Sequence, residues 1–185
     1  MINTFFAKAA VLAGCVLFCS GIFAQSGDLR IVLIRHAEKP FKGDGLTCKG
    51  INRSRELVPV LYSRFGLPAA IYVPDKGKGD TKRSRMYQTV LPFATKYHLP
   101  VSADFHEDEL GELAQAILRQ RGVVLVVWEH GGIPKIARKL GVREDGLHWK
   151  DDDYDSIWIV RYVNGQAVLT KDREGLHPGE ACPVK

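Results

Sequence analysis

A short apolar run, Ile31–Ile34, passes directly into Arg35 and His36 and constrains the fold of this chain more than any other segment. Runs of mostly β-branched residues of this length are typical of strands that are buried on both faces of a parallel sheet. Open α/β sheets bind ligands beyond the carboxyl ends of such strands, which is where this polar pair lies. Taken alone, the dipeptide is a weak motif, and a capping arginine beside a solvated histidine explains it equally well.

The same alternation of apolar runs and helical patterns recurs along the chain. Further strands are predicted over residues 69–73, 100–103 and 122–128. Amphipathic helices are predicted over residues 47–66, 83–97, 109–120 and 131–141. Each strand is therefore followed by a helix, which is the pattern of a parallel sheet with crossover helices.

The pattern changes at the carboxyl-terminal end of the chain. Two strand-like runs, Ser156–Tyr162 and Gln166–Thr170, are joined by Asn164-Gly165. Asn-Gly between two such runs is the strongest short-range signal for a β-hairpin. The sequence as a whole therefore predicts an α/β protein, a three-layer α/β/α sandwich whose mostly parallel sheet ends in a C-terminal antiparallel hairpin.

The first 24 residues differ in composition from the rest of the chain. Lys8 precedes an apolar, uncharged run over residues 9–24, and Ala24 offers a small-residue cleavage point. This pattern is typical of a secretory signal peptide. We therefore expect a signal peptide over residues 1–24, a single domain over residues 25–185, and a secreted or periplasmic protein without stable membrane insertion after cleavage.

Two other interpretations of this amino-terminal segment stay open. An uncleaved membrane anchor is one, although the apolar run is short for a membrane span. The other is a lipid anchor, because Leu12-Ala13-Gly14-Cys15 resembles a bacterial lipoprotein box that places a lipid on Cys15. Against the lipid anchor, cleavage there would leave an apolar stretch at the mature amino terminus.

Cleavage after Ala24 removes Cys15 and Cys19 and leaves Cys48 and Cys182 as the cysteines of the mature chain. An even number of cysteines in an oxidising compartment indicates a disulfide bond. We therefore predict a bridge that ties the C-terminal tail to the start of the first helix.

The formal net charge of the chain is +5, with no block of like charges long enough to form a nucleic-acid-binding arm. This basic excess fits an anionic small ligand at least as well as a polyanion. We therefore expect an anionic small ligand as partner, and no nucleic acid.

Polar side chains follow each of the four predicted parallel strands. These residues are Arg35, His36, Arg85, His106, Glu107, Asp108 and His130. Because the carboxyl ends of parallel strands share one edge of the sheet, these residues are expected to gather in one crevice. Arginines repel cations, so a metal site is not expected, whereas guanidinium groups suit the oxygens of a phosphoryl group.

Four motifs resemble those of the histidine phosphatase superfamily, which includes phosphoglycerate mutases and small phosphohistidine phosphatases. They are RHAE at 35–38, LTCKG at 46–50, RMYQT at 85–89 and EHGG at 129–132. Each motif alone is weak, but the four occur in order with the expected spacing and span nearly the whole mature chain.

The resemblance implies a role for each matching residue. His36 is expected to be the nucleophile that forms a phosphohistidine. Arg35 and Arg85 are expected to bind the phosphoryl oxygens, and His130 to donate to the same oxygens. Thr47 and Arg53 are expected to be structural, the first as a helix cap and the second as a helix-face residue. The resemblance implies neither a metal nor an organic cofactor. Together with the predicted signal peptide, it implies a secreted phosphatase that hydrolyses phosphomonoesters or phosphohistidine and acts on a small phosphorylated substrate or a phosphoprotein. The alternative is a non-catalytic phospho-ligand binding or sensor module.

The general acid is assigned from the residues near the predicted strand ends. The superfamily often carries a long insertion after the third strand that holds this acid, but here residues 103–110 form a short connection. Glu107 follows the predicted end of that strand and is our first candidate, with Glu129 as the second. If the fourth strand continues through Glu129 and His130, their side chains point to opposite faces of the sheet. The acidic run at residues 151–153 is expected to be a solvated lead-in to the following strand.

Overall fold

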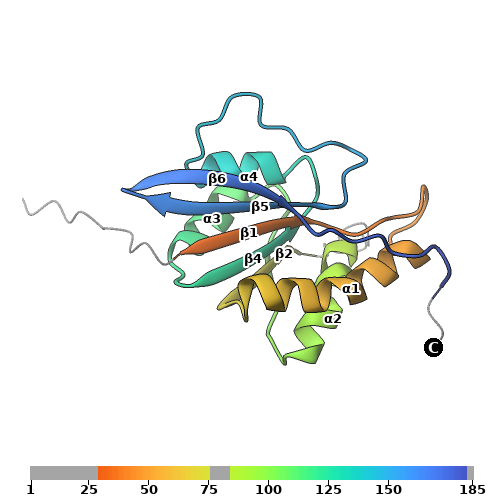
Figure 1. Cartoon of the computed structure of the whole chain (residues 1–185). Helices are drawn as coiled ribbons and strands as arrows, with labels where there is room; N and C mark the ends of the chain where they lie inside the picture. Colours follow the sequence, from red (N-terminus) through yellow and green to blue (C-terminus); the bar gives the residue numbers. More distant parts are fainter. Residues whose placement is uncertain (1–28, 76–83, 183–185) are drawn as a thin grey trace, which may run out of the picture.

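The computed structural model describes residues 29–75 and 84–182, so the predicted signal peptide lies outside the described residues (Figure 1). Ten elements follow one another in the order β1 (Arg30–Arg35), α1 (Cys48–Phe65), β2 (Ala70–Pro74), α2 (Ser84–Lys96), β3 (Ser102–Phe105), α3 (Leu110–Leu118), β4 (Val123–Trp128), α4 (Ile133–Lys139), β5 (Ser156–Val163) and β6 (Gln166–Arg173).

A six-stranded sheet in the order β3-β2-β4-β1-β5-β6 forms the middle layer. β1, β4, β2 and β3 pair in parallel, and β5 and β6 pair antiparallel, with β5 beside β1. α1 and α2 cover one face of this sheet, and α3 and α4 cover the other (Figure 1). The predicted α/β/α sandwich with a C-terminal antiparallel hairpin is confirmed.

β1 separates two apolar cores. Ile31 and Leu33 pack into the core beneath α3 and α4, whereas Val32 and Ile34 pack into the core beneath α1 and α2. All four side chains are fully buried. A strand with helices on both faces needs apolar side chains at successive positions, which explains the continuous apolar run in the sequence.

One strand lies two residues later than predicted. The prediction placed it at residues 100–103, but β3 spans Ser102–Phe105 and pairs with β2 from Ser102 onward. Leu99 and Val101, whose apolar character suggested an earlier start, pack against the core beneath α1 and α2 instead.

The hairpin prediction is confirmed, because Asn164 and Gly165 have φ angles of 52° and 77°, as a type I′ turn requires.

The C-terminal segment, residues 174–182, runs beside the start of α1 (Figure 1). A disulfide bond joins Cys48 to Cys182, as predicted. Beside it, the Asn52 amide donates hydrogen bonds of 2.8 Å to the carbonyl oxygens of Gly179 and Ala181. The described helices include none that is both long and apolar enough to cross a bilayer.

Candidate active site

The site is built where β1 and β4 end side by side. Arg35, the last residue of β1, pairs with Trp128, the last residue of β4. The His36 amide then donates a hydrogen bond of 3.1 Å to the Trp128 carbonyl oxygen. Register therefore brings His36 next to the segment that carries Glu129 and His130, although the two segments are more than 90 residues apart in the sequence.

The His36 ring is held in one tautomer. Its side chain is buried, and Nδ1 lies 2.8 Å from the Ala37 carbonyl oxygen. Because a carbonyl oxygen only accepts, Nδ1 must donate, and a neutral ring then has its lone pair on Nε2. Burial, together with the positive field of Arg35, Arg85 and His130, lowers the pKa of His36 to about 3, despite the opposing hydrogen bond to Ala37. His36 is therefore neutral near pH 7.

Arg35 is anchored by the connection between α4 and β5. Its Nη1 donates to the carbonyl oxygens of Asp151 and Asp153, at 2.6 Å and 3.1 Å. Its guanidinium carbon lies 4.0 Å from the centre of the Tyr154 ring, which is a cation–π contact. These contacts fix the plane of the guanidinium group beside His36.

Arg85, at the start of α2, is oriented by the loop that precedes α1. Its Nη2 donates to the Gly43 carbonyl oxygen at 3.1 Å and lies 3.9 Å from the Asp44 carboxylate. Thr89 lies one helical turn later: its hydroxyl accepts a hydrogen bond of 2.9 Å from the Ala37 amide and donates to the Arg85 carbonyl oxygen. Thr89 therefore joins the start of α2 to the loop of His36.

His130 completes the predicted group of four. Its Nε2 lies 3.2 Å from the Asp151 carboxylate, and its Nδ1 lies 3.7 Å from the Glu129 carboxylate. Arg35, Arg85 and His130 all contribute to the electrostatic field at His36, so the structure brings these four residues together as the sequence predicts.

Three buried nitrogen atoms of this group have no hydrogen-bond partner among the described residues: Arg35 Nε, Arg85 Nε and His130 Nδ1. The two arginine nitrogen atoms are N–H donors, and unsatisfied buried donors are costly, so this group is suited to an acceptor-rich ligand. A tetrahedral oxyanion such as a phosphoryl group supplies several acceptor oxygens at once. In residues 29–75 and 84–182, no group of three or more His, Cys, Asp or Glu side chains is arranged to hold a metal ion.

The acidic run at residues 151–153 precedes β5 and exposes Asp151 and Asp152, as expected of a solvated lead-in, but it also contacts the site. Asp151 and Asp153 hold Arg35 through their carbonyl oxygens, and Asp151 also pairs with His130. Tyr154, which the sequence analysis missed, covers Arg35 and lies 6.0 Å from the His36 ring, measured between ring centres. A tyrosine directly after the acidic run was the available signal.

The two candidate acids lie at different positions along the sheet edge. Glu129 directly follows β4, which pairs with β1, and its charge acts on Arg35. Glu107 is an exposed residue after β3, and β2 and β4 separate β3 from β1. We expected Glu129 and His130 to point to opposite faces if the strand continued through them, but β4 ends at Trp128 and the two side chains lie 3.7 Å apart.

Arg53 belongs to the support of the site, as the sequence analysis expected. Arg53 is buried, and its guanidinium group donates to the Glu38 carboxylate at 2.9–3.0 Å and to the Glu174 carboxyl group at 2.6 Å. Burial raises the pKa of Glu174 to about 8, against the opposing effect of Arg53. Thr47 caps α1 through its bond from the Gly50 amide, which confirms the predicted cap.

Gly50 brings α1 close to the loop of His36. A Cβ atom at Gly50 would lie 2.3 Å from the Glu38 carbonyl oxygen, so no larger residue fits without moving the backbone. The same carbonyl oxygen accepts a hydrogen bond of 2.9 Å from the Thr47 amide. The LTCKG motif therefore packs directly against the loop that carries His36.

Comparison of the sequence with family models of known proteins finds no match. A curated protein, the 4-hydroxy-3-methylbut-2-enyl diphosphate reductase of Aromatoleum aromaticum (strain DSM 19018 / LMG 30748 / EbN1), is 28% identical over 157 residues, which cover 76% of this chain. The match covers 45% of that protein, so this chain spans less than half the length of the curated relative.

Solved structures resemble the chain over most of its length. The protein histidine phosphatase SixA, complexed with tungstate, has a TM-score of 0.55 at 16% identity and covers 78% of this chain and 97% of its own. A putative α-ribazole-5′-P phosphatase from Escherichia coli (strain K-12 substrain MG1655) has a TM-score of 0.53 at 14% identity, covering 85% and 100%. A phosphoserine phosphatase mutant from Entamoeba histolytica in complex with phosphoserine has a TM-score of 0.56 at 14% identity, covering 80% and 97%. The chain therefore has the fold of the histidine phosphatases.

Proposed function

We propose that this protein is a phosphatase that hydrolyses phosphomonoesters or phosphohistidine through a covalent phosphohistidine on His36. The observation that carries the proposal is the contact of 2.8 Å between His36 Nδ1 and the Ala37 carbonyl oxygen. It leaves Nε2 with the lone pair that a nucleophile needs. The solved phosphatases with the same fold support this activity.

The proposed reaction has two phosphoryl transfers. In the first, Nε2 of His36 attacks phosphorus, a bond forms between nitrogen and phosphorus, and the bond from phosphorus to the leaving group breaks. In the second, water attacks the phosphohistidine, the nitrogen–phosphorus bond breaks, and inorganic phosphate leaves with His36 neutral again. Arg35, Arg85 and His130 donate to the phosphoryl oxygens and stabilise the charge that develops on them in both transfers.

A proton has to reach the leaving oxygen and has to be taken from the attacking water later. We propose Glu129 for this role ahead of Glu107, which was the first candidate from the sequence. Glu129 follows the strand next to that of His36 and lies 3.7 Å from His130, so its carboxyl group belongs to the same cluster. Glu107 follows β3, which β2 and β4 separate from the strand of His36.

The test is turnover of a generic aryl phosphate by the mature protein and by His36→Ala. We expect the substitution to abolish turnover, and acid quenching of the wild-type protein during turnover to trap a phosphoryl-enzyme. The matched control is His98→Asn, because His98 is exposed and has a φ of 54°, which asparagine tolerates. Undiminished turnover in His36→Ala would contradict the mechanism. Phosphate binding without turnover by the wild-type protein would favour the non-catalytic binding module.

We further propose that the protein is exported and acts on phosphorylated small molecules or phosphoproteins outside the cytoplasm. The disulfide bond between Cys48 and Cys182 supports an oxidising compartment. Amino-terminal sequencing of the exported protein is expected to start at Gln25, whereas a lipid-modified Cys15 at the mature amino terminus would refute simple secretion.

A further inference from the structure

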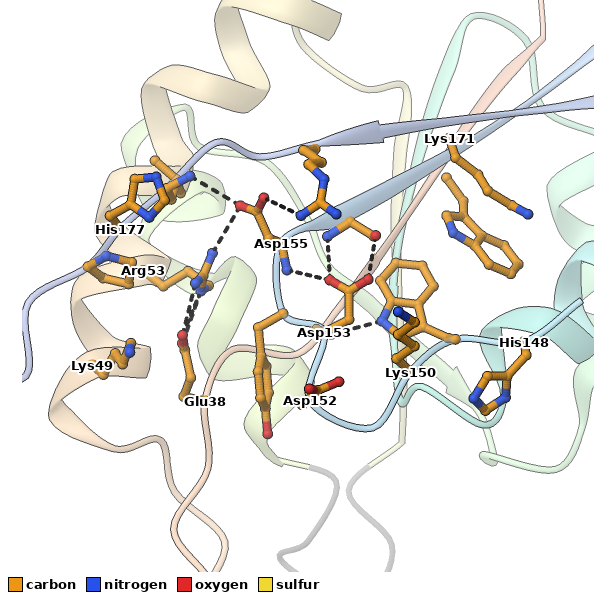
Figure 2. A pocket seen from close by; sticks show the side chains of 17 residues that line it. Glu38, Lys49, Arg53, His148, Lys150, Asp152, Asp153, Asp155, Lys171 and His177 are labelled. Atoms are coloured by element: carbon orange, nitrogen blue, oxygen red, sulfur yellow. Dashed lines mark hydrogen bonds and ion pairs between the residues drawn. The ribbon is translucent and has the colours of Figure 1, made fainter.

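A cavity of about 780 Å³ lies beside the proposed phosphoryl site and is not explained by it. Its walls come from the start of α1, the connection between α4 and β5, strand β6 and the C-terminal segment (Figure 2). Arg35, His36, Arg85 and His130 do not line this cavity. It is therefore a second space, adjacent to the group of four.

Tyr154 connects the two spaces. It lines the cavity, its ring stacks on the Arg35 guanidinium group at 4.0 Å, and its centre lies 6.0 Å from the centre of the His36 ring. One aromatic side chain thus belongs to both walls. A substrate with its phosphoryl group at His36 can extend past Tyr154 into the cavity.

Basic side chains surround the cavity. They come from four segments of the chain and are Lys49, His148, Lys150, Lys171, Arg173 and His177. Lys49 and His177 lie on one side in Figure 2, whereas His148, Lys150 and Lys171 lie on the other. A ligand in the cavity is therefore approached by positive charge from both sides.

The acidic groups of the lining are mostly engaged within the protein. The Asp153 carboxylate accepts hydrogen bonds from the Asp155 and Ser156 amides and the Ser156 hydroxyl, and these bonds hold its pKa below the usual value although burial raises it. Asp155 accepts from two backbone amides of the C-terminal segment and pairs with Arg53 and Arg173. The carboxylates of Asp153 and Asp155 are therefore bound to groups of the protein itself, and they stabilise the cavity wall.

The lysines that line the cavity have fewer or more exposed ion-pair partners than Asp153 and Asp155 have. Lys150 is exposed and forms no ion pair with a described residue. Lys171 pairs with Glu144, and Lys49 lies 3.7 Å from Glu180, but both pairs are largely exposed. Exposed pairs contribute little free energy and are readily exchanged for another anion. Asp152 is the exposed acid that opposes this excess of positive charge.

We propose that this cavity is a subsite for a second anionic group of the substrate, a carboxylate or a further phosphate, on the leaving-group side of the phosphoryl site. The inference rests on the proposed phosphatase function and adds the substrate class to it. The same anionic chemistry is offered by a small metabolite and by an acidic residue close to the phosphorylated residue of a protein.

The experiment compares two substrates that differ only in the second charge. A phenyl phosphate that carries a carboxyalkyl chain is paired with its carboxamide, which has the same length and no charge, and a phosphopeptide with a glutamate near the phosphorylated residue is paired with the same peptide carrying glutamine. For the wild-type protein we expect a higher kcat/KM for the anionic member of at least one pair. Lys150→Gln should reduce that preference by up to about fivefold, and Lys150→Glu by more, because it replaces attraction by repulsion.

The matched control is Lys139→Glu, which makes the same charge change on an exposed residue in the last turn of α4, outside the cavity lining. Lys139→Glu should leave the preference unchanged. The pair of substrates that shows the Lys150 effect identifies the source of the anion. If neither pair distinguishes Lys150→Glu from wild type, the subsite does not exist.

Direct binding separates this inference from the proposed function. Phosphonate analogues of the carboxyalkyl substrate and of the acidic phosphopeptide are titrated into wild type, Lys150→Glu and Lys139→Glu by calorimetry, and this measurement needs no turnover. Turnover of phenyl phosphate without a Lys150 effect on analogue binding would overturn the subsite and leave the phosphatase standing. A Lys150 effect on binding without turnover would support the subsite and overturn the phosphatase.

Discussion

Arg53 Nη1 lies 2.6 Å from Glu174 Oε2, and through this contact the C-terminal segment is joined to the loop that carries His36. The other side of the same guanidinium group holds Glu38, two residues after His36. Both Arg53 and Glu174 are buried. The site is therefore supported by two segments, α1 and the C-terminal segment, whose contacting residues are more than 120 positions apart in the sequence.

Arg53→Met should destabilise the protein by about 3 kcal/mol, because it leaves the Glu38 and Glu174 carboxyl groups buried without their donor. The free energy of unfolding is measured by urea denaturation at pH 7. Lys171→Ala, which breaks the half-exposed pair with Glu144, serves as the control and should cost less than about 1 kcal/mol. Equal losses of unfolding free energy in the two variants would show that the buried contacts of Arg53 stabilise the protein no more than a half-exposed ion pair does.

Stability should depend on pH through His36. Its pKa is about 3 in the folded protein, against 6.5 for an ordinary histidine, so between these values the unfolded chain binds more protons than the folded one. Stability contributed by neutral His36 is therefore present above pH 6.5 and is lost as the pH falls, by about 1.4 kcal/mol per pH unit. Urea denaturation of wild type and His36→Gln from pH 7 to pH 4 tests this, because the variant should lack this part of the slope. Parallel curves would contradict the assigned pKa.

Arg85→Lys should not restore the kcat/KM and the phosphate inhibition that Arg85→Ala loses. The planar guanidinium group is held by the Gly43 carbonyl oxygen and Asp44 while its Nε remains available, a geometry that an ammonium group does not reproduce. Loss of a charged hydrogen bond costs about 1.5–3 kcal/mol, which is roughly ten- to a hundredfold in kcat/KM. Inhibition by inorganic phosphate should weaken in parallel. If phosphate inhibition and turnover of Arg85→Ala equalled those of the wild-type protein, Arg85 would not bind the phosphoryl group.

Glu129→Gln should slow hydrolysis of an alkyl phosphate far more than that of an aryl phosphate, since only the poor leaving group needs a proton. The expected difference is about a hundredfold, in the range of general acid catalysis. Glu107→Gln, measured with the same two substrates, is the comparison that decides between the candidates. A larger leaving-group effect in Glu107→Gln would return the role to the residue that the sequence favoured.

Replacing both Cys48 and Cys182 by serine should lower the free energy of unfolding by at most about 5 kcal/mol, because the bridge closes a loop of 134 residues. The urea midpoint of the variant and that of the reduced wild-type protein should agree. Two free thiols in the unreduced wild-type protein, detected by mass spectrometry after alkylation, would rule the bridge out in solution.

Strands β1, β2 and β4 were predictable because they are buried on both faces, and burial leaves a continuous apolar signal such as Ile31–Ile34. Arg35, His36, Arg85 and His130 were predictable because parallel topology gathers strand ends at one edge. The boundary of β3 was not, because Val101 packs into the core without pairing to β2, and composition does not distinguish the two situations.

The contribution of the connection between α4 and β5 could not be predicted for a different reason. Asp151 and Asp153 hold Arg35 with their backbone carbonyl oxygens, which every residue possesses, across 116 and 118 positions of sequence. Such contacts leave no trace in residue type. Tyr154 and the carboxylate of Asp151 have a characteristic chemistry, but only the fold shows that they lie beside Arg35 and His130.

The bridge between Cys48 and Cys182 turns most of the domain into a covalently closed ring. A single backbone cut anywhere between these cysteines opens the ring without releasing a fragment. The two pieces stay tethered at a high effective concentration, which favours their remaining docked. After a proteolytic nick, His36 and the residues around it would therefore stay on one covalently connected molecule. The two polypeptides would separate only after the sulfur–sulfur bond had been reduced.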